Sequence, residues 1–204
     1  FNNCLKKIYK GERWVRKRSV DNLINELKIM KKTNYKQVFF YDDCFTSDLG
    51  WLKEFTKKYK QEINLPFRSL SHPMFLDKER INLLKEAGCI KIQVGAQTPI
   101  EEIRKEICKR QDSNERIMKA VENIKRAKMV VSVDHIFGLP SEKIEEYYTK
   151  GLDFYIDLKP NMYFTFWLQY YPSTEILDIG KEYGLIDNKE ISRINKGYVS
   201  YGNQ

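Results

Sequence analysis

The chain has 204 residues, of which 42% are hydrophobic and 31% are charged, and this balance excludes disordered and collagen-like proteins. Its 36 Lys and Arg residues outnumber 28 Asp and Glu residues, for a formal net charge of +8. The four cysteines (Cys4, Cys44, Cys89 and Cys108) lack paired short spacings, so no zinc-finger or disulfide pattern is readable and reduced thiols in a cytoplasmic protein are expected.

The positive charge is concentrated at the start of the chain. The first 20 residues carry seven basic side chains and one acidic one, a local net charge of +6. An arm that binds nucleic acid or an anionic ligand would fit this charge, but no aromatic stacking motif accompanies it, which favours a solvated loop. Nucleic acid is therefore not an expected partner. No apolar run approaches the roughly 20 residues of a membrane span.

Helical and strand patterns then alternate along the chain. Ser19, Asp48 and Asp77 are typical N-caps before apolar residues at helical spacing, and Gly88 is a typical helix end. The predicted helices cover residues 20–33, 49–59, 78–87, 100–108, 114–127, 144–158 and 174–183. The predicted strands cover residues 37–41, 67–71, 89–95, 129–137 and 162–169.

This alternation indicates parallel βαβ units with right-handed crossovers, hence an α/β fold with a parallel sheet and outer helices. No glycine-rich dinucleotide turn and no P-loop is present, which favours a barrel or a partial barrel over a dinucleotide-binding fold. In such folds the site lies at the carboxyl ends of the strands.

Polar side chains gather at the predicted strand ends. On the third predicted strand, Gln93, Gly95 and Gln97 share one face by the two-residue period, while Ile90, Ile92, Val94 and Ala96 share the other. The apolar face suits the outer helices, so the polar face is predicted to line a site. The other polar residues at strand ends are Asp42, Asp43, Ser69, Ser71, His72, Thr98, Asp134, His135, Thr165 and Gln169.

Two groups of side chains carry weaker signals. His72 ends a strand and could face the site, whereas His135 lies among apolar residues and is interpreted as a core histidine. The aromatic strand with Tyr163, Phe164 and Trp167 could contact a large flat substrate, but core packing is the preferred interpretation. Two separate histidines are weak evidence for a metal site, and no hydrolase triad is readable.

Four segments come in a characteristic order: FFYDDCFT (residues 39–46), IQVGAQT (92–98), DHIFGLPSE (134–142) and YYPSTE (170–175). Together they resemble the radical S-adenosylmethionine (radical SAM) superfamily, in particular the group whose members often carry an upstream cobalamin-binding domain. The resemblance implies a partial (β/α)6 barrel in which the five strands are the second to the sixth. The first strand and a C-x-x-x-C-x-x-C cluster motif would lie ahead of Phe1, and none of the four cysteines matches a cluster ligand.

The same resemblance implies a division of the chain. Residues 1–204 would form a single domain, residues 1–19 a basic lead-in segment and residues 185–204 the start of a C-terminal extension.

The resemblance assigns cofactor-binding roles, but no catalytic residue and no metal ligand. Asp42 or Asp43 would pair with the ammonium group of S-adenosylmethionine, and Gln93 and Gln97 would approach its ribose and methionine parts. The remaining matched residues, which would support the adenine, are Ile136, Gly138, Pro140, Leu168 and Gln169. The family often has glycine where this chain has Asp134 and Ser141.

The implied activity is reductive cleavage of S-adenosylmethionine by an iron-sulfur (4Fe–4S) cluster, which yields a 5′-deoxyadenosyl radical. Cobalamin-dependent methyl transfer or cyclisation on a small-molecule or cofactor-like substrate would extend it, and this chain alone is expected to be inactive. Two alternatives remain open from the residues. One is a cluster-free (β/α) barrel enzyme that acts on an anionic metabolite, and the other is an RNA-binding module that uses the basic lead-in segment.

Overall fold

Five parallel strands form one sheet in the computed structural model, which describes residues 17–201. The strands follow one another in chain order across the sheet: β1 (Val38–Phe40), β2 (Phe67–Ser71), β3 (Cys89–Gln97), β4 (Val130–Phe137) and β5 (Met162–Trp167). Each predicted strand end lies within two residues of the observed one. The predicted α/β class with a parallel sheet and outer helices is confirmed.

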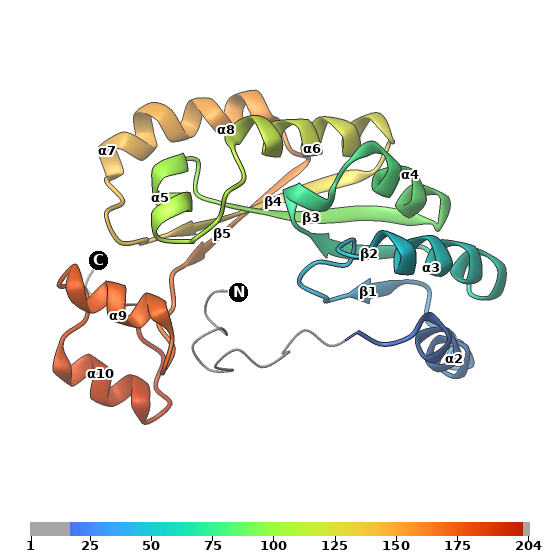
Figure 1. Ribbon diagram of the computed structural model, residues 1–204, viewed down its shortest axis with the longest axis horizontal. Helices are drawn as coiled ribbons and strands as arrows, with labels where there is room; N and C mark the ends of the chain where they lie inside the picture. Colours follow the sequence, from blue (N-terminus) through green and yellow to red (C-terminus); the bar gives the residue numbers. More distant parts are fainter. Residues whose placement is uncertain (1–16, 202–204) are drawn as a thin grey trace.

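The helices are α2 (Val20–Lys31), α3 (Leu49–Glu62), α4 (Lys78–Glu86), α5 (Glu101–Glu106), α6 (Asn114–Arg126), α7 (Ile144–Glu146), α8 (Leu152–Leu158), α9 (Glu175–Glu182) and α10 (Asn188–Asn195). Figure 1 shows α4, α6 and α8 along one face of the sheet, and α9 and α10 beyond the end of β5. We call the helix-packed side the covered face and the other side the open face. The predicted N-caps are confirmed, since Ser19, Asp48 and Asp77 each accept a hydrogen bond from a backbone N–H of the first helical turn.

Three short elements differ from the prediction. The expected single helix over residues 144–158 is interrupted between α7 and α8 by a π-helical turn (Tyr147–Gly151). A Cβ on Gly151 would lie 2.9 Å from a side-chain carbon of Pro99, so this turn fits closely against the loop after β3. A 3₁₀ turn (Pro73–Phe75) and α10 have no counterpart in the prediction.

The main core lies between the covered face and the helices. Its centre is aromatic: Phe40 and Phe67 of the sheet pack around Phe55 and Tyr59 of α3, with ring centroids of neighbouring pairs 4.9–6.2 Å apart. Phe55, Tyr59 and Phe67 are 0% exposed. Two smaller clusters lie near α5 and near α9 and α10.

The predicted alternation on β3 is confirmed. Ile92, Val94 and Ala96 are 0% exposed on the covered face, whereas Gln93 and the other polar residues of β3 are half-buried on the open face. This arrangement separates apolar packing from polar side chains within one strand, and it places the polar set where a ligand can reach it.

Ile90 is an exception, because it is 41% exposed near the beginning of β3. The prediction that Ile90 packs against the helices is therefore wrong.

Other strand-end predictions are wrong. Ser69 and Ser71 are buried on the covered face, where the Ser71 hydroxyl bonds to Thr46, because their register on β2 matches Phe67. Their hydroxyls therefore belong to the packed layer rather than to a site.

The aromatic strand is not core either. β5 is the edge of the sheet, and Trp167 remains 57% exposed because no further strand or helix covers it within the described residues. His135, by contrast, is fully buried as predicted, and its Nδ1 lies 2.9 Å from the hydroxyl of Tyr155.

Candidate functional site

The open face carries the charged side chains of the sheet. Arg68 on β2, Lys91 on β3 and Asp134 on β4 share the two-residue period of Gln93, and all four are half-buried. Charges on a partly buried sheet face are costly unless they are paired or bind a ligand. The open face is therefore the candidate site.

Asp134 is the acidic group of this face. Its Oδ2 accepts a hydrogen bond from Nε2 of Gln93 at 2.7 Å, while its Oδ1 is buried without a hydrogen-bond partner among the described residues. Burial raises the pKa of Asp134, and the bond from Gln93 only partly offsets that effect. A buried carboxylate oxygen without a donor indicates a place where a ligand hydroxyl or amine can bind.

Gly95 makes room beside Asp134. The two residues are register partners, and β3 bulges between Gly95 and Gln97, whose φ is +68°. The Gln97 side chain folds back over Gly95, so that a Cβ on Gly95 would overlap its amide nitrogen. The same Cβ would lie 3.5 Å from Nη1 of Arg110, which brings a guanidinium group to the carboxyl end of β3.

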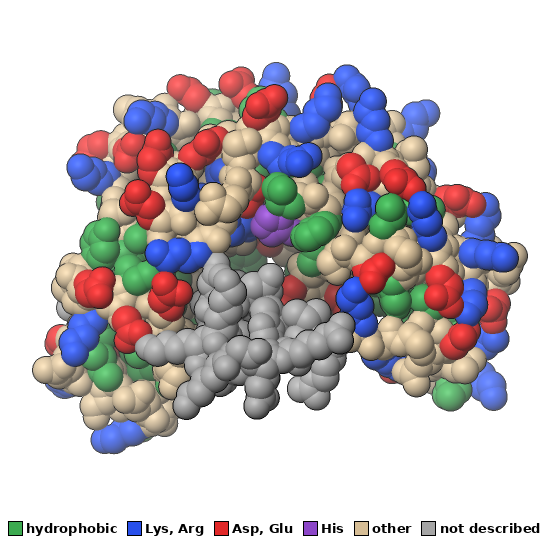
Figure 2. All heavy atoms as spheres, viewed as in Figure 1, with side chains coloured by type: hydrophobic (Ala, Val, Ile, Leu, Met, Phe, Trp, Pro, Cys, Tyr) green, Lys and Arg blue, Asp and Glu red, His purple; other side chains and the backbone are tan. Residues whose placement is uncertain are grey.

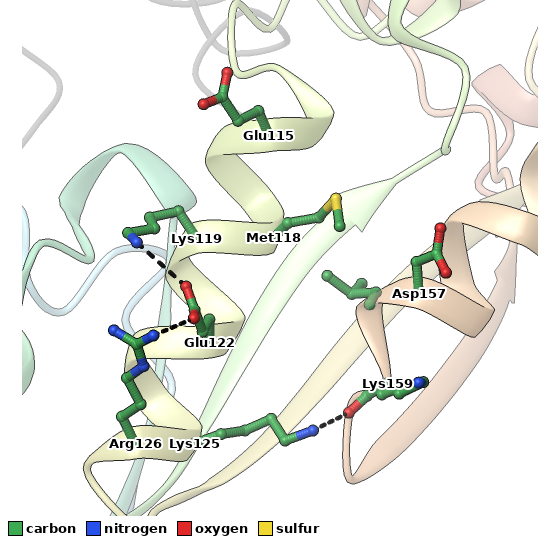
Figure 3. A pocket seen from close by; sticks show the side chains of 9 residues that line it. Glu115, Met118, Lys119, Glu122, Lys125, Arg126, Asp157 and Lys159 are labelled. Atoms are coloured by element: carbon green, nitrogen blue, oxygen red, sulfur yellow. Dashed lines mark hydrogen bonds and ion pairs between the residues drawn. The ribbon is translucent and has the colours of Figure 1, made fainter.

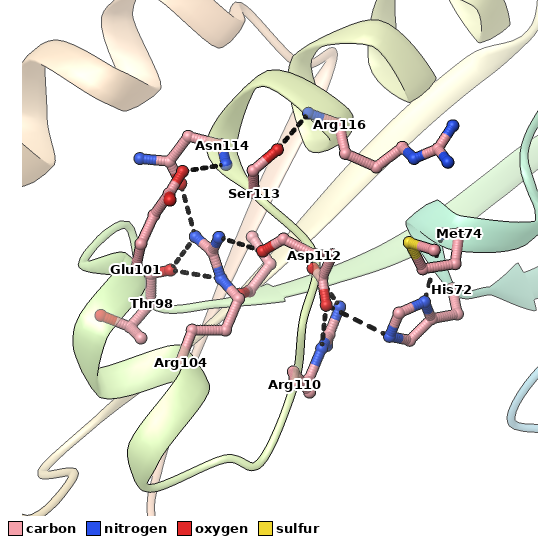
Figure 4. A network of polar contacts seen from close by, with 11 residues as sticks. His72, Met74, Thr98, Glu101, Arg104, Arg110, Asp112, Ser113, Asn114 and Arg116 are labelled. Carbon is pink, nitrogen blue, oxygen red and sulfur yellow. Dashed lines mark hydrogen bonds and ion pairs between the residues drawn. The ribbon is translucent and has the colours of Figure 1, made fainter.

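A network of polar contacts fixes Arg110 (Figure 4). Its Nε and Nη2 donate to the two carboxylate oxygens of Asp112 at 2.9 and 2.8 Å, and the Asp112 side chain is fully buried. His72 Nε2 lies 3.4 Å from the same carboxylate, while His72 Nδ1 accepts from the N–H of Met74. Burial alone would raise the pKa of Asp112, but the bonds from His72 and Arg110 hold it well below its usual range.

Buried Arg104 holds the loop that carries this network. Its Nε donates to the carbonyls of Ala96 and Thr98, both at 3.1 Å. Its Nη1 donates to the carbonyl of Asp112 at 2.9 Å, and its Nη2 donates to Oδ1 of Asn114 at 2.6 Å. Arg104 is 0% exposed, so one side chain ties the end of β3 to the loop before α6.

The predicted acidic pair lies at the carboxyl end of β1, two strands from β3. Asp42 and Asp43 are both exposed. Partial desolvation raises the pKa of Asp43, and the neighbouring Asp42 raises it further. No described contact joins the pair to Gln93 or Gln97, so its role beside an ammonium group stays a prediction.

The predicted adenine-supporting residues divide into two groups. Ile136 and Leu168 meet in the small apolar cluster beside α5, and the N–H of Leu168 donates to the carbonyl of Phe137. Gly138 and Pro140 instead form the turn after β4, where Gly138 has a φ of +77° and its N–H donates to Glu142. The apolar pair can support a ring, whereas the Gly138 N–H is already occupied.

Gln169 lies beyond β5 with its amide engaged. Its Nε2 donates to the Tyr201 hydroxyl at 3.2 Å, and its Oε1 accepts from the Tyr171 hydroxyl at 2.6 Å. The structure therefore leaves only its backbone for the predicted adenine contact.

Other features carry less chemistry. Cys44, Cys89 and Cys108 are free thiols, and residues 17–201 contain no group of three or more His, Cys, Asp or Glu side chains placed to hold a metal ion. Cys4 and residues 1–16 of the basic lead-in segment lie outside the described residues. No helix in the described part of the chain combines the length and apolarity of a membrane span.

A groove of about 650 Å³ lies on the outer surface between α6 and α8 (Figure 3). Glu122 in this groove pairs with Lys119 and Arg126, so the charges of these three side chains are largely neutralised. Figure 2 shows the same mixture of acidic and basic side chains over the helical layer. This surface is typical of solvated helices rather than of a site.

Arg68, Lys91, Arg110 and Asp112 are not among the residues that the sequence predicts for the site. The alternation that predicts Gln93 also places Lys91 on the open face, so Lys91 could have been predicted from the sequence. Arg110 and Asp112 lie in a loop, where no periodic signal exists.

Comparison with known proteins identifies a family. A family model described as the radical SAM superfamily matches residues 4–149. Cytidylyl-2-hydroxyethylphosphonate methyltransferase of Streptomyces wedmorensis is 24% identical over 141 residues, which cover 65% of this chain and 26% of that protein.

Solved structures share the fold. The radical S-adenosylmethionine methyltransferase TsrM from Kitasatospora setae, solved with cobalamin and a 4Fe–4S cluster, matches with a TM-score of 0.72 and 18% identity. That match covers 81% of this chain and 34% of TsrM. Coproporphyrinogen III oxidase (HemN) of Escherichia coli, a radical SAM enzyme, matches with a TM-score of 0.65 and 15% identity over 87% of this chain and 44% of HemN. The chain thus spans only a quarter to less than half of the length of these proteins.

Proposed function

The chain belongs to the radical SAM superfamily of enzymes, and we propose that its open face binds S-adenosylmethionine at the carboxyl ends of β3 and β4. One observation carries this proposal. A guanidinium group (Arg110), a carboxylate oxygen without a partner (Asp134 Oδ1) and a residue without a side chain (Gly95) meet at this place. It is also the strand end at which parallel α/β folds bind ligands.

The residues present fit the groups of this cofactor. S-adenosylmethionine offers a carboxylate, an ammonium group and two ribose hydroxyls. Arg110, held by Asp112, would donate to the carboxylate. Asp134 Oδ1 would accept from a ribose hydroxyl, the Gln97 amide that lies over Gly95 would face the ligand, and the cluster around Ile136 would support the adenine.

A bound 4Fe–4S cluster would supply the electron for the reductive cleavage of S-adenosylmethionine, and so the radical chemistry of the whole enzyme. The proposed cluster ligands lie outside residues 17–201. The part of this chain is to bind and orient: Arg104 fixes the loop, Asp112 fixes the guanidinium, and Gln93 turns the Asp134 carboxylate.

We propose methyl transfer, assisted by cobalamin, as the reaction of the whole enzyme. Two likenesses support it: the curated relative is a methyltransferase, and TsrM is a methyltransferase solved with cobalamin. A small-molecule substrate and an upstream cobalamin-binding domain follow from the same proposal. Free thiols and an iron-sulfur cluster fit a reducing, cytoplasmic compartment.

The two alternatives are weaker. A cluster-free barrel enzyme does not agree with membership of the radical SAM superfamily. The RNA-binding alternative depends on residues 1–19, of which the structure describes only residues 17–19. Lys17 and Arg18 in that stretch already pair with Asp48 and Glu26.

The proposal is tested on the full enzyme, reconstituted without oxygen with iron and sulfide. We expect a brown protein that releases 5′-deoxyadenosine under a low-potential reductant. Arg110→Gln and Asp134→Asn should each weaken S-adenosylmethionine binding about tenfold, because each removes a charge-assisted hydrogen bond. Lys57→Gln on the outer surface is the matched control and should change nothing. Unaltered affinity in both open-face variants, with the fold intact, contradicts the assignment.

A further inference from the structure

A second group of polar side chains lies on the open face, nearer the amino ends of the strands. We propose that Arg68, Lys91 and Ser132 form a binding site for a tetrahedral oxyanion, a phosphate or phosphonate group of the substrate. That the oxyanion belongs to the substrate rests on the proposed function, whereas the site itself rests on the geometry alone.

Arg68 and Lys91 are neighbours by register. They are Cα partners in the β2–β3 ladder, and both side chains lie on the open face. Two cations placed side by side repel each other, and an anion bound between them would remove this cost. Neither residue forms an ion pair within the described part of the chain.

Lys91 lies over the sheet without an acidic partner. Its Nζ is 3.4 Å from Sδ of Met162 and 4.9 Å from the ring centroid of Phe164, so its side chain crosses β4 to reach β5. Burial lowers the pKa of Lys91, and the charge of Arg68 lowers it further. Asp134 is the acid that acts on Lys91, but its Oδ2 is bonded to Gln93 and it makes no ion pair with the ammonium group.

Two buried polar atoms of this group lack a hydrogen-bond partner within residues 17–201. Nε of Arg68 and Oγ of Ser132 are both inaccessible to solvent and have no hydrogen-bond partner among the described residues. Ser132 is 0% exposed and lies on β4, the strand that the Lys91 side chain crosses. Leaving such groups unpaired costs about 1–3 kcal/mol each, so a ligand that pairs them would be favoured.

The arrangement of the donors selects the class of ligand. Arg68, Lys91 and Ser132 come from three successive strands, so an anion bound between them would be approached from separate directions rather than in one plane. A tetrahedral oxyanion has acceptor oxygens in such directions, whereas a planar carboxylate does not. Four residues separate Lys91 from Gly95 on β3 and two separate Ser132 from Asp134 on β4, so this site lies about 7–13 Å along the strands from the proposed cofactor site.

The experiment measures binding of inorganic phosphate to the purified full enzyme by calorimetry, without S-adenosylmethionine. We expect saturable binding that Lys91→Met weakens about tenfold and Ser132→Ala about threefold. Lys57→Met serves as the surface control and should bind phosphate normally. Acetate should bind at least about threefold more weakly than phosphate. In parallel, phosphate should protect Lys91 from an amine-reactive reagent, which locates the site even if a variant is unstable.

Absence of saturable phosphate binding overturns the proposal, as does equal binding of acetate. Loss of phosphate binding in Arg110→Gln but not in Lys91→Met also overturns it, because the anion would then occupy the proposed cofactor site. S-adenosylmethionine binding is measured separately on the same proteins. Its failure with phosphate binding intact would contradict the proposed function and leave the oxyanion site standing.

Discussion

The covered and open faces of the sheet differ in how they accommodate charge. Among the strand residues, Arg68, Lys91 and Asp134 all lie on the open face, and no Asp, Glu, Lys or Arg lies on the covered face. The covered face instead packs apolar residues such as Val94 and Val133, both 0% exposed, against helices. The same backbone thus presents one surface built for stability and one that leaves polar groups to be paired by a ligand.

This difference separates two kinds of buried polar group. On the covered side, the hydroxyls of Ser71 and Thr46 satisfy each other, although Nε2 of His135 is buried there without a hydrogen-bond partner among the described residues. On the open face, Oδ1 of Asp134 and Nε of Arg68 have no partner within the described residues. Three unpaired buried atoms belong to neighbouring strands of the open face, those of Arg68, Ser132 and Asp134, and such a group on adjacent strands indicates binding.

The largest expected effect is the loss of a buried aromatic ring beneath the covered face, compared with the loss of a partly exposed ring on the open face. Phe55→Ala removes a 0% exposed ring that packs against Phe40, Phe67 and Trp51, and we expect a loss of about 4 kcal/mol in the free energy of unfolding. Phe39→Ala on the open face removes a ring that is 37% exposed and should cost less than about 1 kcal/mol. Denaturant titration measures both. Equal losses would mean that the open face is also a packed interface.

The second prediction concerns Arg104, which is fully buried. Arg104→Met replaces the guanidinium group by an apolar side chain and removes the donors to the buried carbonyls of Thr98 and Asp112, so we expect a loss of about 3 kcal/mol in stability. Arg104→Lys restores one charge and should recover only part of that loss, because an ammonium group does not reproduce the planar fork. Full recovery of stability in Arg104→Lys would show that a positive charge is sufficient and that the planar guanidinium geometry is not needed.

The third prediction is a pH dependence from the covered face. Burial lowers the pKa of His135 to about 4, below its ordinary value of about 6.5. The neutral ring therefore contributes stability that is present above pH 6.5 and is lost as the pH falls through about 4, a loss on the order of 3 kcal/mol. His135→Asn keeps an acceptor for the Tyr155 hydroxyl but does not titrate. Denaturant titrations at pH 7 and pH 4 should show a steeper loss in the parent protein, and identical slopes would contradict the assigned pKa.

Local signals predicted most of the fold. Ser19, Asp48 and Asp77 cap helices as expected, because a cap depends only on residues within one turn. The two-residue period correctly divides residues 91–97 of β3 into faces, but not Ile90. Ser69 and Ser71 on β2 differ, because their polar residue type suggests a site whereas their shared period with buried Phe67 places both under the helices.

The candidate site was harder to predict, because its parts meet only through tertiary contacts. Arg110 reaches Gly95 from a loop whose position is set by Arg104, and no spacing in the sequence reports that contact. The aromatic residues of β5 were interpreted as core because composition does not tell an edge strand from a central one. The roles of Asp42 and Asp43 at the cofactor stay predictions.

The smallest effect is expected on the open face itself, from Asp134→Asn. Burial raises the pKa of Asp134 in the folded protein, so the contribution of this carboxyl to stability is fully present below its unfolded value of about 3.9 and is lost as the pH rises through the folded value. The asparagine variant does not titrate and can still accept from Gln93. It should therefore be slightly more stable than the parent at pH 7, by less than about 1 kcal/mol, and this gain should vanish below about pH 4. Denaturant titration at the two pH values measures the difference. A residue that binds a ligand at the expense of stability behaves in this way, whereas a structural carboxylate would make the variant less stable at pH 7.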